Sequence, residues 1–188
     1  LKHYNLTSNL NLSERWYLSQ IEKNWNENDS TLTTDTIYKF SRGHDYSFST
    51  GLNTKIYGLI EINRHKLAAI RHVITPNISF SYNPDFSDEK YGYYKMVQIN
   101  ENGETQRYSI MENGIYGSPS NRKNGNINFG LGNILEMKLR NQKDTSETFQ
   151  KIKLIESLSL NSSYNIFADS LNFSNIRLNA RTRILDVF

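Results

Sequence analysis

Residues 126–139 read NINFGLGNILEMKL, and apolar side chains alternate with polar or small ones along this stretch. One parity is apolar at Ile127, Phe129, Leu131, Leu135, Met137 and Leu139. Successive side chains of a β-strand point to opposite faces, so the pattern predicts a strand with one apolar and one polar face. The stretch exceeds the roughly 5–6 residues of a typical strand and reaches the roughly 9–11 that a tilted strand needs to cross a bilayer.

The same alternation returns in five further segments, which we expect to be strands: residues 4–21, 46–56, 74–82, 158–166 and 176–184. A polar loop is expected at 24–36, a basic turn at 63–66, a polar run at 141–148 and a turn at Asp169-Ser170. The connection 83–125 is long enough to need structure of its own. Within it, Asn102-Gly103 predicts a tight hairpin between strands near 96–99 and 108–110.

Six neighbouring strands without helical periodicity predict an all-β fold, an antiparallel up-and-down meander. The strand length indicates part of a large transmembrane outer-membrane β-barrel, because the smallest barrels already need about eight strands. Residues 1–188 are therefore expected to be a partial barrel domain, and the absence of Met at position 1 also suggests a fragment. By loop length, 24–36 and 83–125 are expected to be extracellular, and 62–69 and 141–150 periplasmic.

Composition excludes several classes of protein. The net charge of +3 comes from interspersed Lys, Arg, Asp and Glu, and no nucleic-acid-binding motif is present, so no nucleic acid is expected as a partner. There is no Cys, hence no disulfide or thiolate metal site. The 12 Tyr and 9 Phe suit aromatic girdles at the two membrane interfaces. No apolar run reaches the about 18 residues of a membrane helix.

Enzyme signatures are missing from the sequence. The four histidines show no metal-ligand spacing, and no nucleophile elbow, Walker loop or zincin motif occurs. The pair Gly130 and Gly132 fits small residues that relieve close packing within a strand. We therefore predict a protein that is not an enzyme, with no catalytic, cofactor-binding or metal site.

The residues at the polar positions of each alternating strand are the candidate functional residues, because a barrel turns its polar face to the lumen. The set predicted to face the lumen and to line a path for cargo is Asn128, Lys138, Asn161, Arg177, Arg181 and Arg183. The three arginines share a parity and form a basic ladder. This ladder pairs with acidic neighbours or a lumen plug, or else it binds phosphate through the planar guanidinium. Lys138 is expected near water at a strand end.

A family resemblance enters at residues 71–86, RHVITPNISFSYNPDF. This stretch resembles a signature of the LPS-assembly protein LptD family, in which a Thr-Pro pair leads a strand that opens into a long loop. The matching residues are Arg71, His72, Pro76, Tyr82 and Pro84. Residues 115–117 and 126–129 resemble that family's Tyr-Gly segment and the strand after it. Pro76 is expected at a strand start or a bulge, where proline is tolerated.

The resemblance implies an outer-membrane barrel of Gram-negative bacteria that inserts lipopolysaccharide into the outer leaflet. Its partners would be lipopolysaccharide, periplasmic LPS-bridge proteins, outer-membrane lipid and an LptE-like lipoprotein plug. The disulfides of enterobacterial members have no counterpart in this cysteine-free chain. Two other functions remain open from the residues themselves: another outer-membrane barrel, such as a transporter or secretion pore, and a soluble β-rich binding or adhesin module.

Overall fold

A computed structural model describes residues 4–64, 66–140 and 149–182. One sheet contains seven strands in the order β1-β4-β6-β9-β10-β11, with β5 paired to β6. Their bounds are β1 Tyr4–Tyr17, β4 Ser41–Thr54, β5 Ile56–Arg64, β6 Leu67–Asn83, β9 Asn124–Arg140, β10 Phe149–Asn165 and β11 Arg177–Arg181. The all-β fold is confirmed, and the pairs β5–β6, β9–β10 and β10–β11 are antiparallel. Over the described residues the sheet is open, with β1 and β11 at its edges.

The chain forms two compact units, which are described separately. Unit 1 comprises residues 1–8, 49–81 and 125–188, and unit 2 comprises residues 9–48 and 82–124. No helix among the described residues is long and apolar enough to cross a membrane.

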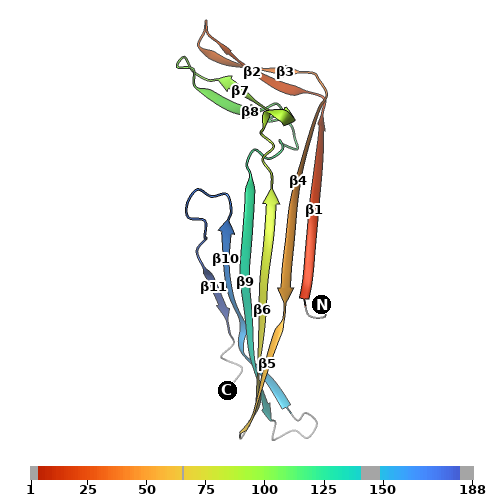
Figure 1. The fold of residues 1–188 in the computed structure, drawn as a ribbon, viewed down its shortest axis with the longest axis vertical. Coiled ribbons are helices and arrows are strands. Elements are labelled where there is room, and N and C mark those ends of the chain that lie inside the picture. The colour runs from red at the N-terminus through yellow and green to blue at the C-terminus, as the bar shows by residue number, and fades with distance from the viewer. Residues whose placement is uncertain (1–3, 65, 141–148, 183–188) are drawn as a thin grey trace. The chain divides into compact units, whose positions relative to one another are not determined.

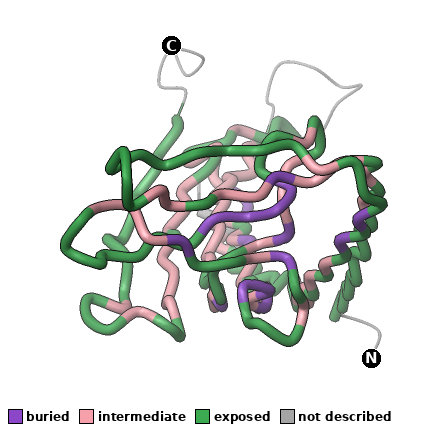
Figure 2. The backbone as a smooth tube through the Cα atoms, turned by 90° about the horizontal axis from the view of Figure 1, so that it is seen from above, coloured by how far each residue is buried: buried purple, intermediate pink, exposed green. Residues whose placement is uncertain are grey.

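Unit 1 is a single-layered sheet in which β6, β9, β10 and β11 lie side by side (Figure 1). Strands β6, β9 and β10 each have 17 residues, so the long strand predicted from residues 126–139 is confirmed and extended at both ends. Few of its described residues are buried. Figure 2 colours the backbone of the chain by burial, with buried residues in purple. Among the described residues of unit 1, no second layer covers this sheet.

Strand β10 begins at Phe149, nine residues before the predicted start at Leu158. The reason is that the register against β9 shifts twice, between Lys153 and Ile155 and between Ile155 and Leu158. Each shift changes the parity of the apolar residues, so simple alternation is not visible there. The residues nevertheless keep one face, since Ile152 is opposite Met137 and Ile155 is opposite Leu135.

The other strands of unit 1 differ from prediction at their ends. The predicted strand 46–56 is β4 followed by β5 after a break at Lys55, and β6 starts at Leu67 because its first residues pair with β5. The basic turn is therefore shorter than predicted, and its His65 lies outside the described residues. Strand β11 is shorter than 176–184, and residues 183–184 are also outside the described part, as is the run 141–148.

Unit 2 contains two hairpins and a short 3-10 helix, η1, at Glu89–Tyr91. The segment predicted as a polar loop at 24–36 is largely the hairpin of β2 Gln20–Asn26 and β3 Thr31–Ile37. The predicted first strand also ends earlier, because β1 stops at Tyr17 and a new strand begins at Gln20. The hairpin inside 83–125 is confirmed: β7 Tyr94–Gln98 pairs with β8 Thr105–Ser109.

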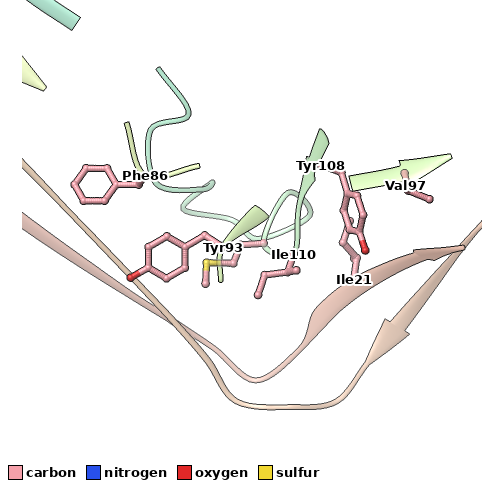
Figure 3. Packing of buried hydrophobic residues seen from close by; sticks show 7 residues of the cluster. Ile21, Phe86, Tyr93, Val97, Tyr108 and Ile110 are labelled. Atoms are coloured by element: carbon pink, nitrogen blue, oxygen red, sulfur yellow. The ribbon is translucent and has the colours of Figure 1, made fainter. Parts of the chain in front are cut away.

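Buried hydrophobic residues hold the two hairpins of unit 2 together (Figure 3). The core consists of Ile21, Phe86, Tyr93, Val97, Tyr108, Ile110 and Met111. The backbone N–H of Ile21 donates to the carbonyl of Ile110 at 2.9 Å, which ties β2 to the segment that follows β8. Gly114 is required beside this core, because a Cβ there would lie 2.5 Å from the ring of Tyr17.

Candidate functional site

The apolar face of unit 1 is widely exposed. Hydrogen bonds and register place the following large side chains on that face, each more than a third exposed: Tyr4, Leu6, Leu52, Ile56, Ile60, Ile78, Phe129 and Leu178. Leu6 is 69% and Ile60 64% exposed. A water-soluble monomer seldom leaves such a continuous apolar surface uncovered, whereas a lipid-facing sheet requires one.

The opposite face of unit 1 is polar over β6, β9, β10 and β11. The amide nitrogen of Asn128 donates to Ser79 Oγ at 3.3 Å, and the Asn77 side chain lies against Gly130 so closely that a Cβ would collide with it. The glycine is therefore small for packing reasons, as the sequence indicated. Asn161 is directly opposite both Gly130 and Arg177 in the sheet.

Three of the predicted residues meet in one shallow hollow of about 300 Å³ on this face. Its lining combines residues of the polar face with Phe129 and Ser162, which the register places on the opposite face: Asn77, Asn128, Phe129, Asn161, Ser162, Ser163, Ser174, Asn175 and Arg177. The hollow offers amides, hydroxyls and one guanidinium to a ligand, and it holds no pair of groups arranged for acid–base chemistry. Such a lining suits a polar surface along which a hydrophilic group could be bound.

The arginine ladder is only partly available for a ligand. Arg181 Nε lies 3.1 Å from Glu156 Oε2, so its charge has an acidic neighbour. This agrees with the prediction that the ladder pairs with acidic side chains, the alternative to phosphate binding. Arg177 lines the polar hollow instead. Arg183 lies outside the described residues, and the ladder is described for its first two members only.

Lys138 lies in a second group of residues at the β5 end of the sheet. Its Nζ is 3.8 Å from the centre of the Phe149 ring, and Arg71 Nη2 is 2.7 Å from Glu136 Oε2. A hollow of about 260 Å³ is lined by Leu59, Ala69, Arg71, Glu136, Met137, Lys138 and Lys151. The sequence did not indicate Leu59 or Lys151, since Lys151 precedes the register shifts of β10 that hide the alternation.

The five residues of the family motif are not brought together. His72 Nε2 lies 3.2 Å from Asn133 Oδ1. Pro76 lies within β6 and not at a strand start, the first of its two expected positions. Because proline lacks an N–H, it cannot donate a ladder hydrogen bond at that point. Tyr82 and the buried Pro84 belong to unit 2. The motif therefore follows β6 and the segment by which the chain leaves it.

In the described part of the chain, no three His, Asp or Glu side chains are grouped so that they could hold a metal ion.

A family model described as LptD protein matches residues 1–188, the whole chain. The chain belongs to the LptD family. The resemblance first noted at 71–86 is thus confirmed and extends to both flanks. LptD proteins are transport and assembly proteins rather than enzymes, they are associated with the outer membrane, and the family indicates a function related to lipopolysaccharide transport. No curated protein and no solved structure matches this chain.

Proposed function

We propose that this LptD-family chain forms part of the wall of an outer-membrane barrel that inserts lipopolysaccharide into the outer leaflet. The apolar face of unit 1 contacts membrane lipid, and the polar face lines the interior along which lipopolysaccharide passes. Lipopolysaccharide is delivered by periplasmic bridge proteins, and an LptE-like lipoprotein occupies the interior as a plug.

One observation carries the proposal: a family match over the whole chain coincides with a single-layered sheet that has one exposed apolar face and one polar face. Strands of 17 residues are long enough to cross a bilayer with tilt. The polar hollow with Asn128, Asn161 and Arg177 adds hydrogen-bonding groups suited to a sugar or phosphate.

Depletion of the full-length protein in its own cells tests this function. We expect lipopolysaccharide at the cell surface to fall and to return when the gene is restored, because no other route would deliver it to the outer leaflet. Surface lipopolysaccharide is measured on intact cells. An unchanged surface level would reject the LptD-type role and would favour another kind of outer-membrane barrel.

Photo-crosslinking tests which face meets the cargo. A photoreactive amino acid at Asn128, Asn161 or Arg181 should capture lipopolysaccharide or the plug, since these positions share the polar face. The controls are Phe129 and Leu160 on the opposite face, where adducts with membrane phospholipid are expected. Adducts with lipopolysaccharide or plug from these two positions alone would reverse the assignment of the faces.

A further inference from the structure

We propose that the hollow between Lys138 and Lys151 binds the phosphate group of an acylated, anionic lipid. This inference rests on the proposed function and names a contact for the cargo that the family match does not assign. The site lies wholly within unit 1, on strands β5, β6, β9 and β10. Its charge and its apolar lining both support the assignment.

Charge is the first argument. Lys138 and Lys151 are direct cross-strand partners, a position in which side chains are about 5 Å apart at Cβ and like charges destabilise the sheet. The nearby carboxylate of Glu136 is shared with other cations, because it pairs with Arg71 and is opposite Lys153 across the strands. The two ammonium groups thus lack a shared acidic partner among the residues lining the hollow. A phosphate placed between them would accept hydrogen bonds from both.

Apolar surface beside the lysines is the second argument. Leu59 is an apolar side chain on this polar face, where it is opposite Arg71 of β6, and it is 62% exposed. Ala69 lines the same hollow. Phe149 lies under Lys138 and is itself 39% exposed. A free phosphate ion would leave these side chains uncovered, whereas a phosphorylated lipid would satisfy the ammonium groups and cover Leu59 and Phe149 together.

The experiment measures binding of fluorescent bisphosphorylated lipid A to the full-length protein in nanodiscs. The double substitution Lys138→Gln and Lys151→Gln should weaken binding at least about tenfold, because two charge-assisted hydrogen bonds are lost. Binding of the same lipid without phosphates should not change. The variant Lys138→Arg with Lys151→Arg keeps both charges and should bind like the wild type, which separates lost charge from misfolding.

A matched control removes two positive charges elsewhere, at the exposed Lys39 and Lys55. This control should leave binding of the phosphorylated lipid unchanged. Equal weakening in the control and in the Lys138 and Lys151 variant would show that only net charge matters and would overturn the site. Inorganic phosphate that competes as strongly as the lipid would also overturn it, since the apolar side chains would then contribute nothing.

Failure of this inference can be distinguished from failure of the proposed function. If depletion leaves surface lipopolysaccharide unchanged, the transport function itself is rejected. If depletion lowers it and the wild-type gene restores it, but the Gln variant binds phosphorylated lipid A as tightly as the wild type, only the phosphate site is rejected.

Discussion

Replacing Phe129 by arginine should sharply reduce the amount of the full-length protein assembled in the outer membrane. Phe129 is the sixth of the 17 residues of β9, lies on the apolar face and is 40% exposed. On a lipid-facing surface, a charged arginine costs up to about 2–4 kcal/mol, the value at the bilayer midplane. That is a large fraction of the roughly 5–15 kcal/mol by which domains are usually stable. The assembled protein is measured in isolated membranes by its resistance to unfolding in detergent.

The neighbouring substitution Asn128→Arg is the matched control. This substitution adds the same side chain to the same strand but on the polar face, where the amide of Asn128 donates to Ser79 Oγ. We expect near-normal assembly, because a charge on that face stays in contact with water. Equal, small effects of both substitutions would contradict a lipid-facing role for Phe129. They are what a soluble binding module would give, because a partly exposed Phe in water tolerates replacement by Arg.

Strand β9 shows what the sequence could predict. Its apolar residues keep one parity from Ile127 to Leu139, with Ile134 as the exception, so the strand and its two faces followed from alternation alone. Strand β10 contains as many residues, yet only its second half was predicted. The register shifts near Ile155 preserve the faces in three dimensions while they break the pattern in the sequence. A bulge depends on the neighbouring strand, and one strand's sequence does not reveal it.

Unit 2 shows a second limit of prediction. The turn between β2 and β3 has no glycine: it uses Asn26, whose side chain contacts Asp29 and accepts from the N–H of Asn28, and Ser30 with a φ of 50°. The flanking strands are mostly polar, so no alternation marked a hairpin, and the Asn, Asp and Ser residues of the turn were therefore predicted as part of a polar loop. By contrast, Asn102-Gly103 carried the expected signal, and Gly103 has the positive φ of 78° that favours glycine.

The candidate site was predicted in part. Parity grouped Asn128, Asn161 and Arg177, and the register brings these three to one hollow. The pairing of Lys138 with Lys151 was not predicted, because it depends on the register of β9 against the first half of β10. Sequence alternation gives the face of a residue, but cross-strand partners come only from the alignment of two strands.

Replacing Phe86 by alanine should loosen unit 2 while leaving the sheet of unit 1 intact. Phe86 is fully buried, and its ring centre lies 5.5 Å from that of Tyr46 and 5.2 Å from that of Tyr91. Its N–H also donates to the carbonyl of Ser120 at 2.8 Å, which holds the two ends of the long connection together. Removing a buried Phe side chain typically costs about 3–5 kcal/mol, because a cavity remains.

Hydrogen exchange of the full-length protein measures this effect by strand. Amide protection in β7 and β8 should fall by about a hundredfold or more, since every ~1.4 kcal/mol is a factor of ten, and protection in β9 and β10 should stay the same. The control is Tyr38→Ala, whose side chain is 89% exposed and contributes little to stability. An equal loss of protection in β9 and β10 would mean that the two units unfold together. Because unit 2 has its own core at Phe86 and unit 1 has an uncovered single layer, we expect the two to respond separately.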